Sequence, residues 1–400
     1  MRRTDKICIV TSLAVVLLCA VLFFTVLKKD SSDRIVKVGF VYSGDESEPY
    51  AQNFIRSQHA VEAEFGDRVE VSVRSNIPDA EEDSEKAIRS LAEEGCDIIF
   101  ITLGYAESAK RLAAEFPDIQ FCQQVGGNSE QADTTRNYHT FMGRIYEGRY
   151  VSGVAAGMKL REMIDARVIT AEQARVGYVA AYPSADVISG YTAFILGIRS
   201  VVPKAVMTVT YTNTWSSYTL EKEAEERMIA DGCVLISQHT DTIGPAVACE
   251  NAAGDLPVYN VGYNQSMVDV APTTSLVSTR INWTPYIIGA VEAVLEGKRI
   301  ESHVKGSVHG NDIGAGFDRG WVEVIELNSI IAAKGTQEKI DEVIEEFKKG
   351  KAEVFKGDYI GVDPTDPADT IDLSSGYKEN DRSSAPSFHY VLKDVVQIAE

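Results

Sequence analysis

The sequence lacks the motifs of the common enzyme and metal-site classes. Its six cysteines form no C-x-x-C pair, and its six histidines are scattered without the spacing of metal ligands. The G-x-S-x-G, Walker A and H-E-x-x-H motifs are also missing. A resident metal, a phosphate cradle or a nucleophile–base pair therefore has no support in the sequence. We expect a protein that is not an enzyme and has no cofactor.

Positive charge is also scarce. The 400 residues include 39 Lys and Arg against 59 Asp and Glu, which gives a formal net charge of −20 at pH 7. Such a surface repels the phosphates of nucleic acids and of anionic lipids. We therefore expect no nucleic-acid partner. We also expect a body that is tethered to a membrane rather than adsorbed on it.

Long hydrophobic runs are absent except for one near the N-terminus, residues 7–27. At about 1.5 Å per residue, a helix of this length spans roughly 30 Å, the thickness of a bilayer core. The run is too long for the apolar region of an ordinary signal peptide. We predict that residues 1–34 hold an uncleaved membrane anchor, with the body outside the cytoplasm. Cleavage and a lipid on Cys19 stay open as alternatives, although the preceding Leu18 is not the small residue typical of lipoproteins.

Four cysteines follow this segment: Cys96, Cys122, Cys233 and Cys249. Three of them lie in or beside apolar, strand-like runs, so we predict buried free thiols. Because an exported domain can oxidise its cysteines, a disulfide among the four stays open.

The body contains an internal repeat. The strand-like residues 37–41 recur as residues 175–179, and residues 94–101 recur as residues 231–238. The two offsets are 138 and 137 residues. Two independent matches at nearly one offset indicate a duplicated unit.

Each copy alternates apolar strands with amphipathic helices, which is typical of a doubly wound parallel α/β sheet. The expected helices of the first copy cover residues 51–65, 79–94 and 106–115, and those of the second copy residues 220–230 and 243–251. We predict two lobes in series with a cleft between them. The first lobe takes residues 35–154, the second takes 155–283, and residues 284–400 return across both. In that last part, residues 363–386 are rich in Asp, Pro and Ser, which indicates a surface loop or a lid.

Ligands of open α/β sheets bind beyond the carboxyl ends of the strands. The loops at these ends carry aromatic, carboxyl and amide side chains and almost no Lys or Arg. This combination suits a planar, hydrogen-bonding, uncharged ligand rather than an anion. The candidate ligand-binding residues are Asp45, Tyr50, Tyr105, Tyr182, Asp186, His239, Thr240, Asp241, Asn264 and Trp283.

Structural roles stay open for several of these residues. Asp45, His239 and Asp241 precede expected helices and are alternatively helix caps. Trp283 is alternatively a cover for the hinge between the lobes. We assign Arg149, with the nearby Arg144 and Glu147, to ion pairs at that hinge.

Residues 141–153 read FMGRIYEGRYVSG and resemble the signature of the basic membrane protein (BMP) family, the PnrA-like substrate-binding proteins of ABC transporters. Weaker matches to the same family lie at residues 176–179, 193–200, 238–241, 282–286 and 354–357. The resemblance covers roughly residues 35–400. It implies a type I periplasmic binding protein fold, in agreement with the repeat. It also implies an ABC permease as partner and a purine nucleoside or nucleobase as ligand.

The resemblance also bears on individual residues. Asp45 matches an Asp of the family's first loop, whereas Glu48 stands where the family has a base-stacking aromatic, and Tyr50 is the nearest substitute. The loop at residues 264–266 reads Asn-Gln-Ser and lacks the family's ribose-binding Asp. Trp283 stands where nucleoside receptors have a Lys. A free nucleobase is therefore as good a candidate as a nucleoside, and a ligand sensor or a receptor for another polar solute stays as an alternative.

Overall fold

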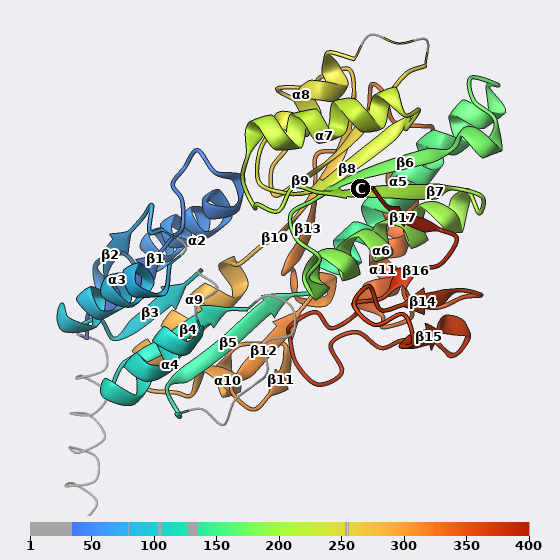
Figure 1. Cartoon of the computed structure of the whole chain (residues 1–400). Coiled ribbons are helices and arrows are strands. Elements are labelled where there is room, and N and C mark those ends of the chain that lie inside the picture. Colours follow the sequence, from blue (N-terminus) through green and yellow to red (C-terminus); the bar gives the residue numbers. More distant parts are fainter. Residues whose placement is uncertain are drawn as a thin grey trace, which may run out of the picture.

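The computed structural model describes residues 34–78, 80–102, 106–125, 135–252, 254 and 256–399. Two α/β lobes lie side by side and are joined by several chain crossings (Figure 1). The expected anchor lies outside the described residues. Within them, no helix has both the length and the apolar character needed to span a membrane.

The first lobe is built on a seven-stranded sheet with helices on both faces. The strand order is β11-β12-β5-β4-β3-β1-β2, and all neighbours are parallel except β11 and β12. The strands are β1 (Val36–Val41), β2 (Val69–Arg74), β3 (Ile98–Ile101), β4 (Gln120–Gln124), β5 (Tyr138–Gly143), β11 (Ser307–His309) and β12 (Asp312–Ala315). One face is covered by α2 (Pro49–Phe65) and α9 (Thr284–Leu295). The other is covered by α3 (Glu81–Glu93) and α4 (Ala106–Glu115).

The second lobe repeats this plan with the strand order β13-β10-β9-β8-β6-β7-β17. Its strands are β6 (Arg175–Ala180), β7 (Val206–Tyr211), β8 (Leu235–His239), β9 (Tyr259–Tyr263), β10 (Ser275–Ile281), β13 (Val322–Ile325) and β17 (Val396–Ile398). On one face lie α5 (Ile145–Asp165), α6 (Ala185–Val201) and α11 (Thr336–Lys348). On the other lie α7 (Tyr218–Ala230) and α8 (Gly244–Glu250).

The sequence repeat corresponds to a structural one. Gly39 of β1 is paired with Ile99 of β3, and Gly177 of β6 is paired with Ile236 of β8. A Cβ at Gly39 would lie 3.0 Å from the Leu91 side chain, and one at Gly177 would lie 2.6 Å from that of Met228. In each lobe the glycine therefore lets the equivalent helix, α3 or α7, pack closely on the central strand. This close packing explains why the glycine occurs in both copies of the repeat.

Three chain crossings join the lobes, at residues 143–145, 281–284 and 315–322. They are hydrogen-bonded: the Arg144 amide donates to the Ala315 carbonyl at 2.8 Å, and the Asn282 amide donates to the Trp321 carbonyl at 2.8 Å. Helix α5 begins directly after the first crossing and packs on α6 of the second lobe. The boundary that the sequence analysis sets after residue 154 thus lies inside α5.

The C-terminal region forms a small sheet of β14 (Ile360–Val362), β15 (Thr370–Asp372) and β16 (Val391–Leu392). The segment 363–386 contains β15 and no residue that lines the cavity described below, so the expectation of a lid is wrong. Polar groups of this segment instead form hydrogen bonds with both lobes. The Ser384 amide donates to Asp312 of β12, and Glu379 accepts from Ser189 Oγ of α6 at 2.9 Å. These bonds hold the segment against both lobes.

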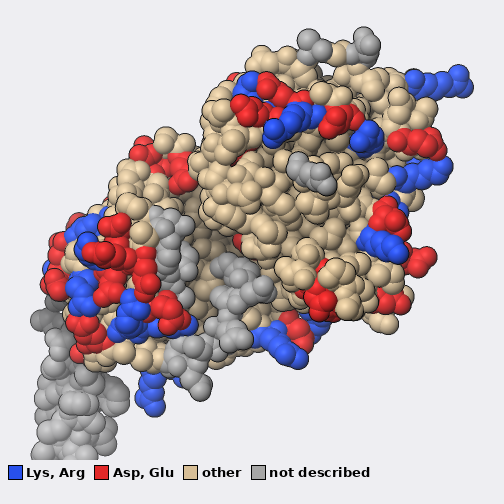
Figure 2. Space-filling view, in the orientation of Figure 1, with Lys and Arg blue, Asp and Glu red and all other residues tan. Residues whose placement is uncertain are grey.

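Charged side chains gather on the outer helices. Figure 2 shows acidic and basic groups mixed over the outer face of the first lobe and along the outer edges of the second. On the first lobe, Arg111 of α4 pairs with Glu81 and Glu85 of α3 at 2.8 and 2.6 Å. The solvated outer helices thus carry paired charges of both signs.

Candidate functional site

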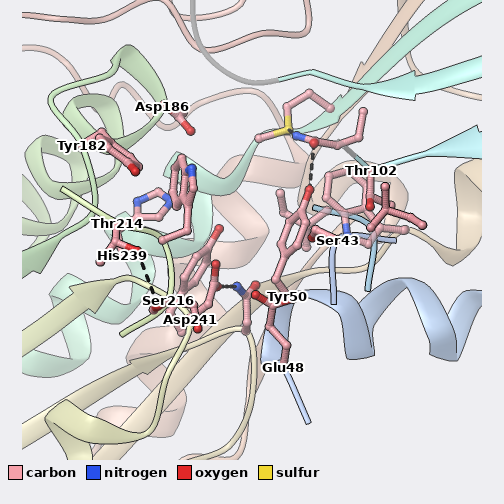
Figure 3. A pocket seen from close by; sticks show the side chains of 18 of the residues that line it. Ser43, Glu48, Tyr50, Thr102, Tyr182, Asp186, Thr214, Ser216, His239 and Asp241 are labelled. Carbon is pink, nitrogen blue, oxygen red and sulfur yellow. Dashed lines mark hydrogen bonds between the residues drawn. The ribbon is translucent and has the colours of Figure 1, made fainter. Parts of the chain in front are cut away.

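A cavity of about 580 Å³ lies between the lobes. Its walls come from the loops at the carboxyl ends of strands in both sheets, where open α/β sheets bind their ligands. The first lobe contributes Ser43, Glu48, Tyr50, Asn76, Ile77, Pro78, Thr102, Gln124 and Met142. The second lobe and the hinge contribute Tyr182, Asp186, Thr214, Trp215, Ser216, His239, Asp241, Tyr263, Asn264, Ile281 and Trp283. Figure 3 shows the two groups facing each other.

Seven of the ten candidate residues line this cavity: Tyr50, Tyr182, Asp186, His239, Asp241, Asn264 and Trp283. Tyr105 lies outside the described residues. Thr240 is buried and does not line the cavity; its carbonyl accepts from Gln238 Nε2 at 3.1 Å. Asp45 does not line the cavity either. Its carboxylate accepts from the Ser47 amide at 2.9 Å, which closes a turn ahead of α2.

The starts of α2 and α8 bear on the alternative that Asp45, His239 and Asp241 are helix caps. Helix α2 begins after Glu48 and α8 begins after Ile243, and neither of these residues caps its helix with its side chain; the Gly244 amide of α8 donates to Thr242 Oγ1 at 3.1 Å. Asp241 instead accepts from Asn264 Nδ2 at 2.9 Å inside the cavity wall.

Two lining loops were missing from the expected site. One follows β2 and supplies Asn76, Ile77 and Pro78, and the other follows β7 and supplies Thr214, Trp215 and Ser216. Both occupy the carboxyl end of a strand, so the rule used for the other loops would have found them. Tyr263 also lines the cavity, although it is not among the candidate residues.

The second lobe presents an aromatic wall. The rings of Tyr182 and Trp215 lie 5.6 Å apart, and those of His239 and Tyr263 lie 4.6 Å apart, both in edge-on arrangements. Trp215 links the two pairs, with its ring 6.3 Å from that of His239. Such a wall offers a flat ligand a large apolar contact area at little cost in side-chain entropy.

Trp283 belongs to both the hinge and the cavity. Its ring is stacked on Phe54 of α2 at 4.6 Å and meets Phe141 of β5 edge-on at 5.5 Å. Only 1% of the residue is exposed to solvent, and it also lines the cavity. The hinge role and the ligand role that the sequence left open are therefore compatible.

Arg149 lies behind the aromatic wall. It is fully buried, and its guanidinium lies 4.1 Å from the centre of the Tyr263 ring and donates to the Gln238 carbonyl. It makes no ion pair within the described part of the chain, so its assignment to the hinge ion pairs is wrong. Arg144 and Glu147 do pair, at 2.9 Å. Burial and the charge of Arg149 lower the pKa of His239 well below its usual value, so this imidazole is neutral at pH 7.

Among the described lining residues, three carry carboxyl groups, Glu48, Asp186 and Asp241, and none is a Lys or an Arg. Burial and the nearby Glu48 raise the pKa of Asp241 well above its usual value. Burial and Asp45 raise the pKa of Glu48. The cavity therefore suits a neutral or cationic ligand with hydrogen-bond donors and disfavours an anion.

The local backbone aims the amide of Asn264 into the cavity. Asn264 follows β9 and adopts a left-handed conformation with φ of 64°, which Asn tolerates better than most residues. Its side chain accepts from Asn53 Nδ2 of α2 at 3.2 Å and donates to Asp241. The two hydrogen bonds thus connect Asn53 of the first lobe, through Asn264, to Asp241 of the second lobe.

Comparison with known proteins agrees with this geometry. The sequence profile of the PnrA-like ABC transporter substrate-binding proteins, the Bmp family, matches residues 35–352. A purine-binding protein of Brucella abortus (strain 2308) is 32% identical over 270 residues, which are 66% of this chain and 71% of the relative. A putative ABC transporter glucose-binding protein of Haloferax volcanii is 34% identical over 219 residues, which are 54% of this chain and 51% of that protein.

The fold is shared with solved solute-binding proteins. An ABC transporter solute-binding protein from Conexibacter woesei superposes with a TM-score of 0.60 at 17% identity, over 79% of this chain and 97% of that chain. This likeness confirms the type I periplasmic binding protein fold. Because the family profile spans most of the chain, the protein belongs to the PnrA-like (Bmp) family of ABC transporter substrate-binding proteins.

Proposed function

We propose that the interlobe cavity binds a purine, as the free base or the nucleoside, and that the protein delivers it to an ABC permease. As a family member the protein is a solute-binding protein rather than an enzyme, and it acts outside the cytoplasm. The choice of a purine as the ligand rests chiefly on one observation. Aromatic rings, carboxyl groups and amides from both lobes line one cavity that has no described Lys or Arg.

The aromatic wall suits the faces of a purine, and the carboxyl and amide groups suit its edges. The relative in Brucella abortus is named as a purine-binding protein, which supports the same class. The free base and the nucleoside are both retained. The loop at residues 264–266 lacks the family's ribose-binding Asp, and the Asn264 amide is already bonded to Asn53 and Asp241.

A sugar is the second candidate ligand. The relative in Haloferax volcanii is named as a putative glucose-binding protein. Aromatic rings beside carboxyl and amide groups also suit the apolar face and the hydroxyl groups of a sugar. The ligand screen therefore includes glucose.

The proposed mechanism is a shift between open and closed arrangements of the lobes. Ligand contacts to both lobes stabilise the closed arrangement, and no covalent bond is made or broken. Since the cavity walls come from both lobes, only the closed form offers the ligand its full set of contacts.

Calorimetric titration of the full chain in detergent with adenine, adenosine and glucose tests the ligand. We expect saturable binding of a purine and none of glucose; saturable binding of glucose alone would overturn the purine. Trp215→Ala should weaken purine binding at least tenfold, because it removes an aromatic group from the wall. Tyr218→Ala is the matched control, since Tyr218 is similarly exposed on the same lobe and does not line the cavity.

The membrane anchor in residues 1–34 also belongs to the proposal. Its support is the single apolar run at residues 7–27. The full chain should stay in the membrane fraction after washing with alkaline carbonate. Mass spectrometry of the extracted chain distinguishes an intact N-terminus from a lipid on Cys19 and from cleavage.

A further inference from the structure

The carboxyl groups of Glu48 and Asp241 approach the cavity from opposite lobes. Glu48 immediately precedes α2 of the first lobe, and Asp241 follows β8 of the second. Both line the same cavity (Figure 3). Closing the lobes thus brings two acidic groups into one desolvated space.

No cation compensates for this pair in the described structure. The cavity walls contain no described Lys or Arg, and the buried Arg149 lies behind Tyr263 and donates to a backbone carbonyl. Burial raises the pKa of Tyr50 well above its usual value, and the nearby Asp241, Tyr263, Glu48 and Asp186 raise it further, so the acidic groups act across the cavity. Closure without a ligand therefore brings the carboxyl groups of Glu48 and Asp241 together where no described lining residue is a Lys or an Arg.

The position of Glu48 depends on a glycine. A Cβ at Gly44 would lie 1.9 Å from Glu48 Oε2, so the carboxyl group occupies space that only glycine leaves free. Oε2 is buried and has no hydrogen-bond partner among the described residues. A buried acceptor without a partner is unfavourable, so this carboxyl group is stabilised when it turns toward a donor in the cavity.

We infer that Glu48 and Asp241 form a selective pair that favours ligands with an amino group or a positive charge. The inference rests on the proposed use of this cavity as the ligand site. An amino group or a cation between the two carboxyl groups makes charge-assisted hydrogen bonds to both lobes. A carbonyl oxygen at the same place binds only after a carboxyl group takes up a proton, which is a cost that an amino group or a cation does not meet. Because the two carboxyl groups belong to different lobes, a ligand that bonds to both of them also favours lobe closure.

Two matched ligand pairs test the inference by calorimetric titration of the full chain at pH 7.5. Adenine has an amino group where hypoxanthine has a carbonyl oxygen, and benzamidine is cationic where benzamide is neutral. We expect at least tenfold tighter binding of the amino or cationic member. Glu48→Gln and Asp241→Asn should reduce that preference several-fold.

Glu46→Gln is the control, because it removes a charge from the same loop at an exposed residue that does not line the cavity. Gly44→Ala keeps every carboxyl group but displaces that of Glu48, so it should act like Glu48→Gln.

The outcomes separate this inference from the proposed function. Equal binding of both members of each pair would overturn the carboxyl selection while leaving the purine assignment in place. A preference for benzamidine with no binding of either purine would support the selection and overturn the purine. Binding of none of the four compounds would overturn both.

Discussion

Asn53 and Asn264 join the two lobes by a single buried hydrogen bond, in which Asn53 Nδ2 donates to Asn264 Oδ1 at 3.2 Å. The two residues are 211 positions apart in the sequence. Asn264 also bonds to a cavity residue of its own lobe, because its Nδ2 donates to Asp241 at 2.9 Å. The bond thus forms only when the lobes are close, and it fixes the orientation of an amide beside the ligand cavity.

Asn53→Ala should weaken ligand binding about five- to thirtyfold. The reason is that Asn264 Oδ1 then loses its partner in the closed form, which costs roughly 1–2 kcal/mol. Calorimetric titration measures the change. The control is Gln52→Ala, which removes an amide hydrogen bond within the first lobe only, from Gln52 Nε2 to the Glu46 carbonyl. An unchanged affinity in Asn53→Ala would show that the bond has no part in closure.

Glu147 should make stability fall as the pH rises. This carboxyl accepts from the Phe317 amide at 2.8 Å, and burial raises its pKa from 4.5 to about 7 despite the neighbouring Arg144. The folded state therefore holds a proton that the unfolded state releases between pH 4.5 and 7. The stabilisation is present below pH 4.5 and is lost as the pH rises through about 7.

At about 1.4 kcal/mol per pH unit, this effect amounts to roughly 3 kcal/mol. Denaturant unfolding of the wild type and of Glu147→Gln at pH 5 and pH 8 measures it, because Gln cannot titrate. We expect the wild type to lose more stability than the variant between the two pH values. Parallel pH profiles would refute the assignment.

Gly197→Ala should destabilise the second lobe. The helices α5 and α6 cross at this residue, and a Cβ there would lie 2.2 Å from the Tyr150 carbonyl oxygen. Overpacking against a backbone atom costs about 1–3 kcal/mol or more, since the helices have to separate. Gly289→Ala in α9 should cost less, because its nearest atom is a Val304 methyl group at 3.0 Å that can move. Thermal unfolding compares the two variants.

The four cysteines of the described body should resist alkylation in the native protein. All four are buried and free, as the sequence analysis predicted. Burial raises the pKa of Cys96 and of Cys233 to about 11, so few thiolates exist at neutral pH. Peptide mass spectrometry after iodoacetamide treatment should find these residues labelled only in denaturant. Rapid native labelling of any of them would contradict the buried positions.

Much of the fold could be predicted because its signals are local or repeated. The expected helix at residues 106–115 coincides with α4, and the expected helix at residues 220–230 ends with α7 at Ala230. Other helix and strand ends differ by one to three residues, since α2 begins at Pro49 and α3 begins at Glu81. Apolar periodicity and the duplicated segments are sufficient for such elements, because each depends on neighbours in the chain.

The edges of the sheets could not be predicted in the same way. Strand β12 joins β5 from a point about 170 residues further along the chain, and β17 joins β7 from the C-terminus. The same limit applies to Arg149, whose sequence context indicates an ion pair. Its actual partners are the ring of Tyr263 and the carbonyl of Gln238. They lie on strands β9 and β8 of the sheet against which α5 packs.

By itself, the sequence determined the two α/β lobes, the strand ends that form a site and the scarcity of basic groups there. These properties follow from hydrophobic periodicity, from a duplicated segment and from residue type, which are local. Only the tertiary structure decided that Asn53 meets Asn264 and that Glu48 faces the same cavity as Asp241. Such pairs depend on how two separately folded sheets are positioned across a hinge, and no pattern within either lobe encodes that distance.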